Sequence, residues 1–423
     1  MRILMISATF PYPPTKGGTQ VRTFNLLKYL QQKNHAVTIA TLRDTTVSDA
    51  EVMALRNVVS ELVIFDRPTP VTSGVSTGAS TRVITGPWNK LQRSLGFITT
   101  GTPSGVRSSH SPDLQAWITQ AVHDSKFDAI TCEHSVNEIY IDPTWKRTLS
   151  VSVNIHSSVY ATCKNQLETG TAEKPLRDRL TLPLLKRYEK RFSQKFSTLI
   201  VTTPDDAQQF TAFAPQSPIH IIPNGVDFND FPYQDAEAID PASPSDLIFI
   251  GAMDNLANID AARFLAHEIF PQVQRRYPAT RLLLVGSRPV PEVLSLSKPN
   301  EIIVTGAVPS MADYLHQARV CVIPMRTGFG IKNKTLEAMA AGTPVVSSDR
   351  GLEGLEICAE NSPEQVRALR ANTPAEYITA ISTLFDRREL RQTLSRSARA
   401  YIERDFTWEQ AGLHYERAIS GEP

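Results

Sequence analysis

The most informative segment of the 423-residue chain is Gly328-Phe329-Gly330-Ile331-Lys332-Asn333-Lys334-Thr335-Leu336-Glu337-Ala338-Met339-Ala340. It follows an apolar run and changes from glycine-rich to helical, which predicts a loop that leads from a strand into a helix. Free amides at the start of that helix, together with Lys332 and Lys334, favour an anion such as a diphosphate. A solvated basic helix behind a capping loop is the plainer alternative.

Short apolar runs alternate with longer helical patterns along the whole chain. This order is typical of α/β proteins with parallel sheets, and most of the runs are too hydrophobic to leave one face of a sheet in water. The expected strands are residues 2–8, 36–42, 61–65, 129–132, 149–153, 199–201 and 220–222 in the first half and 247–251, 281–285, 301–304, 320–324 and 344–347 in the second.

Two shifts in composition divide the chain. Residues 66–111 are rich in Ser, Thr, Gly and Pro, which predicts a long insertion at about residues 67–110, near a substrate or at the surface. A second shift, at residues 227–245, precedes the strand that restarts the βα pattern. We therefore predict two Rossmann-like, doubly wound domains, residues 1–240 and 241–405, which face each other across a deep interdomain cleft.

The composition is that of an ordinary globular protein. Lys and Arg number 44, Asp and Glu number 43, the net charge is +1, and 41% of the residues are hydrophobic. Nucleic-acid binding and a disordered tail are therefore not expected. The four cysteines lack metal-ligand spacing, and the sequence holds no run of about 18 apolar residues that would predict a spanning helix. We expect a cytoplasmic protein.

Small and polar residues follow several strands of the first half. Gly17 and Gly18 precede a helix after the first strand, a geometry suited to an anionic group, although a plain tight turn is an equal alternative. His134 and His156 come just past two successive strands, so both are expected at the floor of the cleft. Asn154 and His156 are the candidates to contact an acceptor or a sugar, which Asn154 would orient. A histidine packed in a loop is the plainer interpretation of each ring.

Four motifs resemble one large family of enzymes. They are Pro223-Asn224-Gly225-Val226-Asp227, Phe249-Ile250-Gly251, Val304-Thr305-Gly306-Ala307-Val308 and Leu336-Glu337-Ala338-Met339-Ala340-Ala341-Gly342-Thr343-Pro344-Val345-Val346. The pattern is similar to that of the nucleotide-sugar-dependent retaining glycosyltransferases of GT-B fold, of the family-four or group 1 type. The likeness covers nearly the whole chain and is strongest from Asp246 to Gly354. Residues 404–415 are similar to the family's last helix, which crosses back to the first domain.

The resemblance implies a role for each matching position. The first domain would bind the acceptor, the second would bind a UDP- or GDP-linked sugar, and residues 406–423 would form the helix that crosses back. Glu337 matches the glutamate that binds the nucleotide ribose, and His134 matches the active-site histidine. Lys334 is a third catalytic candidate, because it can balance the charge of the leaving diphosphate. The other expected donor contacts are Gly17, Gly18, Gly251, Arg288, Gly306, Val308, Gly328, Phe329, Gly330, Ile331 and Lys332.

Two positions depart from the family pattern. The family usually has a first glutamate near the donor sugar, eight residues before Glu337, but this chain has Phe329 there. The glycines on either side of Phe329 resemble a variant of the motif in which backbone amides replace side-chain contacts. The basic pair that many members carry after the Gly251 strand is also absent. The candidates to replace its charge are Lys332, Lys334 and Arg288.

A strongly basic segment runs from Lys174 to Lys195. It holds eight basic and two acidic residues, for a net charge of +6, with leucines between them. A solvated helix face explains this composition most simply. The functional interpretation is a peripheral contact with an anionic membrane, at its inner face, or with a phosphorylated acceptor. Apolar side chains of the insertion, between Trp88 and Phe97, would assist such a contact.

These observations predict an enzyme that moves a sugar from a nucleoside diphosphate donor to a hydroxyl acceptor, with retention at the anomeric carbon. The acceptor would be a glycan, a lipid-linked molecule or a small molecule, in polysaccharide or glycoconjugate biosynthesis. No cofactor and no metal are expected, because the resemblance implies metal independence and the sequence holds no Asp-x-Asp motif. Two alternatives stay open: a nucleotide-sugar epimerase of the same fold, and a non-catalytic module that binds nucleotide sugars or glycans.

Overall fold

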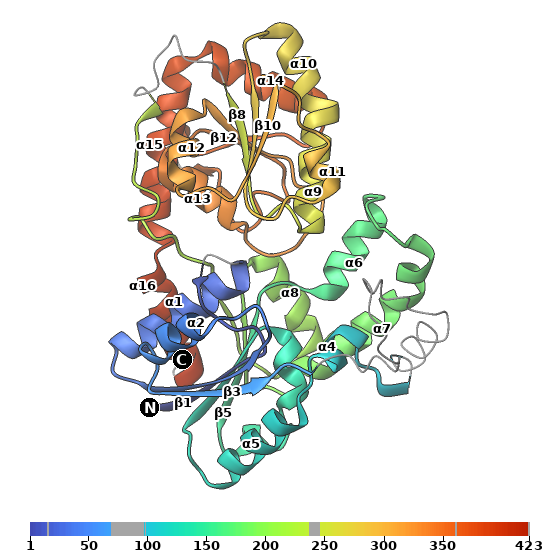
Figure 1. Cartoon of the computed structure of the whole chain (residues 1–423), viewed down its shortest axis with the longest axis vertical. Coiled ribbons are helices and arrows are strands. Elements are labelled where there is room, and N and C mark those ends of the chain that lie inside the picture. The colour runs from blue at the N-terminus through green and yellow to red at the C-terminus, as the bar shows by residue number, and fades with distance from the viewer. Residues whose placement is uncertain (15–16, 69–96, 98, 237–245, 360–361, 422–423) are drawn as a thin grey trace.

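The computed structural model describes residues 1–14, 17–68, 97, 99–236, 246–359 and 362–421. Its two large sheets have seven and six strands, and every strand pairing within them is parallel. The seven-stranded sheet comes from the first half of the chain and the six-stranded sheet from the second half (Figure 1). The predicted α/β class with two doubly wound domains is confirmed.

The N-terminal sheet has the strand order β3-β2-β1-β4-β5-β6-β7. Each strand expected in this half is present, with ends that differ from the expectation by two residues at most. Its strands are β1 (Arg2–Ser7), β2 (Ala36–Arg43), β3 (Glu61–Asp66), β4 (Ala129–Glu133), β5 (Ser150–Ile155), β6 (Thr198–Val201) and β7 (Ile219–Ile221).

Helices cover both faces of this sheet, as the alternation in β1 requires. Ile3 and Met5 pack against α1 (Gly18–Gln32), α2 (Asp49–Arg56) and α16 (Trp408–Ser420), whereas Leu4 and Ile6 point to the opposite face. That face is covered by α5 (Pro112–His123), α7 (Pro175–Ser193) and α8 (Pro204–Phe213). Phe97, which we expected to assist a membrane contact, packs in this core instead. The rest of that expected apolar segment lies outside the described residues.

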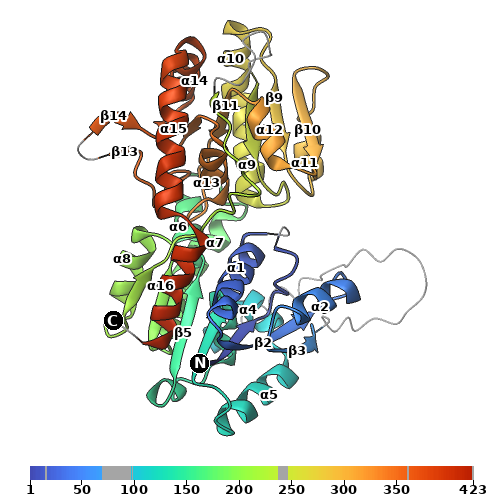
Figure 2. The ribbon, with the colours of Figure 1, turned by 90° about the vertical axis from the view of Figure 1, so that its left-hand side faces the viewer.

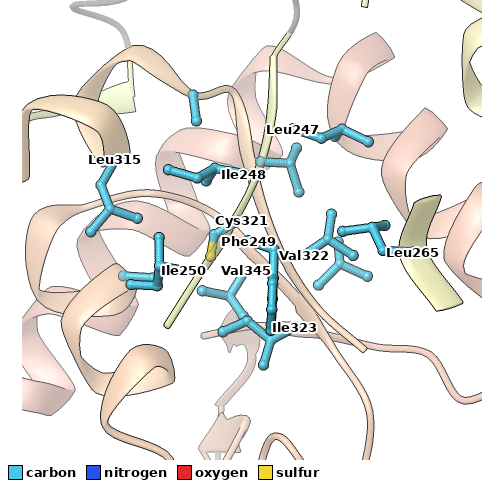
Figure 3. Packing of buried hydrophobic residues seen from close by; sticks show 14 of the residues in the cluster. Leu247, Ile248, Phe249, Ile250, Leu265, Leu315, Cys321, Val322, Ile323 and Val345 are labelled. Carbon is cyan, nitrogen blue, oxygen red and sulfur yellow. The ribbon is translucent and has the colours of Figure 1, made fainter. Parts of the chain in front are cut away.

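The C-terminal sheet has the order β10-β9-β8-β11-β12-β15. Its strands are β8 (Leu247–Ile250), β9 (Leu282–Val285), β10 (Ile302–Gly306), β11 (Val320–Ile323), β12 (Val345–Ser347) and β15 (Leu369–Arg370). All four residues of β8 are buried, with side chains on both faces of the sheet (Figure 3). The sequence analysis missed β15 and the antiparallel pair β13 (Cys358–Ala359) and β14 (Ser362–Val366), which are too short or too polar for an apolar run to reveal.

The remaining helices complete the two domains. In the N-terminal half they are α4 (Ser104–Ser108), α6 (Val159–Glu168) and the 3₁₀ helices η2 (Ser135–Tyr140) and η3 (Trp145–Arg147). In the C-terminal half they are α9 (Leu256–Phe264), the π-helical turn η5 (Leu265–Ile269), α10 (Phe270–Arg276), α11 (Pro291–Leu294), α12 (Met311–Gln317), α13 (Asn333–Ala341), α14 (Pro374–Asp386) and α15 (Arg388–Asp405).

The chain passes between the domains twice at one place. The segment after β7 meets the segment between α15 and α16, where the Val226 amide donates to the Phe406 carbonyl over 2.9 Å. Gly225 is required there, because a Cβ would lie 2.4 Å from the Trp408 amide nitrogen. After this crossing α16 lies beside α1 in the N-terminal domain (Figure 2). Gly412 permits the contact, since a Cβ there would overlap the Tyr29 ring.

Candidate functional site

The site lies where the order of the C-terminal sheet reverses. The chain steps from β8 to β9 in one direction and from β11 to β12 in the other, so β8 and β11 are neighbours at the switch point. Ligands of open α/β sheets bind outside the carboxyl ends of the strands at such a point. The loop of residues 324–332 and the first turn of α13 follow β11 at this end. The predicted strand, glycine loop and helix are all present.

The backbone at the end of β8 is closely packed, and the ammonium of Lys334 lies beside it near the switch point. A Cβ on Gly286 would lie 1.8 Å from the Gly251 carbonyl oxygen, so the loops after β8 and β9 touch through their backbones. A Cβ on Gly251 would lie 3.2 Å from the Lys334 Nζ. The ammonium of Lys334 therefore stands beside the strand after which the family's basic pair is absent.

Lys334 and Glu337 lie on one face of α13. The Lys334 ammonium donates to the Asn258 Oδ1 and stands 5.1 Å from the centre of the Phe249 ring. Burial, assisted by repulsion from Lys332, lowers the pKa of Lys334 to about 8. Burial also raises the pKa of Glu337 to about 7, against the attraction of Lys334. The pair combines a cation, a carboxylate and the free amides of a helix N-terminus.

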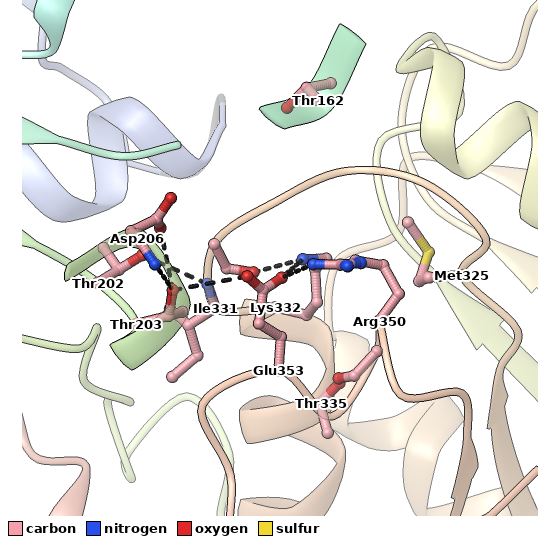
Figure 4. A network of polar contacts seen from close by, with 12 residues as sticks. Thr162, Thr202, Thr203, Asp206, Met325, Ile331, Lys332, Thr335, Arg350 and Glu353 are labelled. Atoms are coloured by element: carbon pink, nitrogen blue, oxygen red, sulfur yellow. Dashed lines mark hydrogen bonds and ion pairs between the residues drawn. The ribbon is translucent and has the colours of Figure 1, made fainter. Parts of the chain in front are cut away.

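The loop that carries Phe329 reaches the N-terminal domain. Gly328 and Gly330 have φ angles of +94° and +84°, a region that favours glycine. A Cβ on Gly330 would lie 2.5 Å from the His156 carbonyl oxygen. The next amide, of Ile331, donates to the Thr202 hydroxyl over 3.4 Å, a contact shown in Figure 4. The glycine loop therefore contacts the segments that follow the carboxyl ends of β5 and β6.

Lys332 is engaged differently from Lys334. Its ammonium donates to the Gly330 carbonyl and forms a 3.3 Å ion pair with Glu353 (Figure 4). Arg350 also pairs with Glu353, at 3.0 Å, and its guanidinium lies 3.9 Å from the centre of the Phe329 ring. Lys332 thus braces the loop and its ammonium is balanced by a carboxylate, whereas Lys334 lies at the switch point.

A second carboxyl group faces this cluster from the N-terminal domain. Thr203 caps α8, accepts from the Asp206 amide and donates to the Asp206 carboxyl group, and its hydroxyl lies 3.5 Å from the Glu353 Oε1. Burial and the nearby charge of Glu353 raise the pKa of Asp206 to about 7. The two domains therefore meet here through buried polar groups.

The two predicted histidines lie together. The ring centres of His134 and His156 are 5.1 Å apart, edge to face. The His134 Nδ1 accepts a hydrogen bond from the Val136 amide, so the neutral ring carries its proton on Nε2. Burial lowers the pKa of His134 to about 4. The ring is thus a neutral hydrogen-bond donor near pH 7. The backbone of His134 has a φ of +85°, a strained conformation for a residue other than glycine.

Other predicted site residues are distributed unevenly. Asn154 has no exposed surface, because its Oδ1 accepts from Arg22 and its Nδ2 donates to Glu133, both over 2.9 Å. Asn154 therefore holds Arg22 and Glu133 in place beneath the surface of the site, and its side chain is not accessible to an acceptor. Arg288 forms a 2.6 Å ion pair with Asp254 at the end of β9. Gly17 caps α1 and Gly18 begins it, while Gly306 ends β10 and Val308 follows two residues later.

Three residues in contact with this site were missed by the sequence analysis. Arg22 is fully buried on α1, and its Nη1 donates to the Asn224 Oδ1 over 2.7 Å. An arginine on the apolar face of a helix is seldom buried unless it is paired, so the sequence pattern around Arg22 could have indicated a buried polar partner. Asn224 stood within a quoted motif without an assigned role. Thr202 follows an ordinary buried strand, so nothing in the sequence marked it.

A hollow of about 410 Å³ lies next to the glycine loop. Residues of α6 line one side and the loops after β11 and β12, including Arg350, line the other. Because Arg350 stacks on Phe329, the hollow adjoins the loop that carries Phe329. The two domains thus enclose space beside the candidate donor site.

In the part of the chain that the structure describes, no three His, Cys, Asp or Glu side chains gather as a metal site. None of the helices in those described ranges is both long and apolar enough to cross a bilayer.

Comparisons with known families identify the class of this protein. The model of Glycosyltransferase Family 4 matches residues 16–230, and the model of Glycosyl transferases group 1 matches residues 244–387. The first match alone spans half of the chain. The chain belongs to glycosyltransferase family 4, so the predicted family membership is confirmed. No curated protein sequence matches it.

Solved structures share the fold over the whole length of the chain. Sucrose-phosphate synthase from Thermosynechococcus elongatus is 20% identical, with a TM-score of 0.64 over 98% of this chain and 97% of its own. HepE of Anabaena, in complex with UDP and glucose, is 14% identical, with a TM-score of 0.63 over 99% of both chains. A variant of TarM from S. aureus, bound to UDP, fondaparinux and a GlcNAc-glycerol, is 12% identical, with a TM-score of 0.64 over 99% of this chain and all of its own. These similarities show a GT-B fold.

Proposed function

We propose that this glycosyltransferase moves a hexosyl group from a UDP- or GDP-linked donor to a hydroxyl acceptor, with retention of the anomeric configuration. The observation that carries the proposal is the position of Lys334. Its ammonium stands at the switch point beside Gly251, at the first turn of α13, where helix amides already favour an anion. A diphosphate there would gain charge-assisted hydrogen bonds of about 1.5–3 kcal/mol each.

The chemistry follows from the charges around this position. Lys334 and the α13 amides would stabilise the negative charge that develops on the leaving diphosphate as the sugar–oxygen bond breaks. An oxygen of that diphosphate would take the proton of the incoming hydroxyl on the same face of the sugar, which retains the configuration. His134, neutral and carrying its proton on Nε2, would donate to a sugar hydroxyl. Glu337 would accept from the two ribose hydroxyls.

Two of the related structures contain UDP, either free or as part of UDP-glucose. HepE of Anabaena was solved with UDP-glucose, and the TarM variant was solved with UDP. UDP-sugars are therefore the first donors to test, and GDP-sugars the second. The acceptor would be a glycan or a lipid-linked molecule, and turnover would need neither a cofactor nor a metal ion.

A peripheral membrane contact would use the first half of α7. Leu176 and Leu180 are 77% and 79% exposed, one turn apart, with Lys174, Arg177 and Arg179 around them. This combination suits the surface of an anionic bilayer. The end of the basic segment is engaged within the protein, because Arg191 donates to Thr102 and Lys195 pairs with Glu138. The protein would then act at the cytoplasmic face of a membrane.

A thermal-shift screen tests the proposal. UDP-, GDP- and ADP-linked hexoses would be added one at a time, and the cognate donor should raise the unfolding temperature by mass action. The Lys334→Met variant should lose most of that shift. Transfer would then be followed with and without EDTA, and NMR of the first-formed product would report the anomeric configuration. No shift with any donor, or an inverted product, would contradict the proposal.

A further inference from the structure

A chain of buried side chains links the last helix of the protein to the helix of the candidate donor site. Tyr415 of α16 donates its hydroxyl to Glu133 at the end of β4. Glu133 accepts from the Asn154 amide, and Asn154 in turn accepts from the Arg22 Nε, both over 2.9 Å. Buried polar groups need such partners, and here each is supplied by the next residue.

The chain then crosses from one domain to the other. The Arg22 Nη1 donates to the Asn224 Oδ1 over 2.7 Å. The Asn224 amide donates to the Asn333 Oδ1 over 2.6 Å. Asn333 is the first residue of α13, one position before Lys334. One guanidinium therefore binds the strand that leads to His156 and, through one asparagine, the helix that carries Lys334.

Arginine suits this position for a geometric reason. Its planar guanidinium directs two hydrogen bonds to two amide oxygens at fixed angles, which a lysine ammonium cannot reproduce. Arg22 is only 1% exposed, and burial lowers its pKa to about 10, so it stays cationic at neutral pH. The full desolvation of a charged group is compensated here by directed bonds to Asn154 and Asn224.

Two buried nitrogen atoms near this chain have no hydrogen-bond partner among the residues that the structure describes. They are the Arg22 Nη2 and the His156 Nε2. Burial lowers the pKa of His156, and the charges of His134 and Arg22 lower it further. Unpartnered buried donors in native proteins are normally completed by a water or a ligand. The guanidinium of Arg22 therefore keeps hydrogen-bonding capacity for a water or a ligand beside this chain.

We propose that Arg22 is a positioning residue, which sets the first turn of α13 against the His134 and His156 half of the site through Asn224 and Asn333. The inference rests on the proposed function, because alignment of the two halves matters only if donor and acceptor react between them. Misplacement by about 1 Å can cost about a hundredfold in rate, whereas nucleotide affinity depends on groups of the second domain.

Arg22→Lys tests this role, because it keeps the buried charge and loses the two directed bonds. We expect kcat for nucleotide release from the donor to fall at least tenfold, with KM for the donor and Kd for UDP within about twofold of the wild type. Arg43→Lys is the matched control. Arg43 also makes directed bonds, to Val47 and Asp49, after the end of β2, and is not part of the chain from Tyr415 to Asn333. The kcat of the Arg43→Lys variant should therefore not change.

A double-mutant cycle tests the connection itself. Arg22→Lys combined with Asn333→Ala should lower kcat no further than the more severe single variant, because both break one chain. The inference would be overturned if the reductions in kcat of the two single variants multiplied in the double variant. It would also be overturned if Arg22→Lys kept the wild-type kcat, or if it lost UDP affinity in parallel with kcat. Hydrogen exchange at residues 333–337 of the ligand-free protein should be faster in Arg22→Lys and unchanged in Arg43→Lys. That measurement decides the inference even if the wild type binds no nucleotide sugar, an outcome that would refute only the proposed function.

Discussion

The carbonyl oxygen of His156 lies 2.5 Å from the position that a Cβ on Gly330 would occupy. The two residues belong to different domains, so this contact sets how closely the glycine loop approaches β5. We predict that Gly330→Ala lowers kcat at least tenfold through loop displacement, while UDP affinity changes little, because Lys334 and Glu337 are untouched. Steady-state kinetics and calorimetric titration would measure both. Gly170→Ala is the control, since Gly170 has a φ of +69° but open space around it.

Donor affinity should depend on pH in a narrow range. Glu337 has a raised pKa of about 7 and Lys334 a lowered pKa of about 8. Below about pH 7 the carboxyl group is protonated and accepts poorly from ribose, and above about pH 8 the ammonium loses the charge that holds the diphosphate. Affinity for UDP-glucose, which has no terminal phosphate to titrate, should therefore be greatest between these values. Glu337→Gln should abolish the decline on the acid side, and a flat profile in the wild type would contradict the assignment.

The two lysines of the donor helix should differ in their effects. Lys334→Met removes a cation from the switch point and should weaken UDP binding by about ten- to a hundredfold, which is the value of one charge-assisted hydrogen bond. Lys332→Met removes one of the two cationic partners of Glu353 and should lower the unfolding temperature, with a smaller effect on UDP affinity. Calorimetric titration and thermal unfolding of both variants separate these roles. Equal losses of UDP affinity would show that both lysines bind the diphosphate.

Tyr415→Phe tests the anchor of the crossing helix. The substitution leaves the buried Glu133 without its phenolic donor, and we expect a loss of about 1–3 kcal/mol in the free energy of unfolding of the N-terminal domain. The half-buried Tyr314 supplies a control, and Tyr314→Phe should change stability by much less. Scanning calorimetry would resolve the domain that is affected. A loss confined to the C-terminal domain would contradict the anchoring role.

The exposed leucines of α7 should determine membrane binding. The double variant Leu176→Ser/Leu180→Ser should lose most of its co-sedimentation with vesicles of phosphatidylglycerol and phosphatidylcholine, and keep its affinity for UDP. Leu294→Ser is the control, because Leu294 is 50% exposed but lies in the C-terminal domain. Equal sedimentation of the double variant and the wild type would exclude this surface as the contact.

The fold was largely predictable because most of its strands are buried on both faces. Continuous apolar runs such as Leu247–Ile250 are visible in a sequence without knowledge of their partners. The edge strand β15 was not predictable in the same way. It has two residues, Leu369 and Arg370, and exists only because β12 provides a neighbour for pairing. Its signal is tertiary and not local.

The candidate site was predictable where chemistry follows the local chain and unpredictable where it depends on contact between domains. The glycine loop, Lys334 and Glu337 stand together in the sequence, so their proximity followed from helix geometry. The role of Lys332 required Glu353, and the burial of Asn154 required Arg22. These contacts join residues that are far apart in the sequence, and a single amino-acid sequence does not show which distant residues come into contact.

The packing of α16 has a consequence for the order in which this protein folds. Tyr415, Ala418 and Ile419 complete the same apolar cluster as Ile3 and Met5 of the first strand. During synthesis the first domain emerges from the ribosome long before residues 408–420, so one side of its core stays open until these residues have been translated. The N-terminal half therefore reaches its final stability only after residues 408–420 have left the ribosome, and part of its apolar core stays exposed until then.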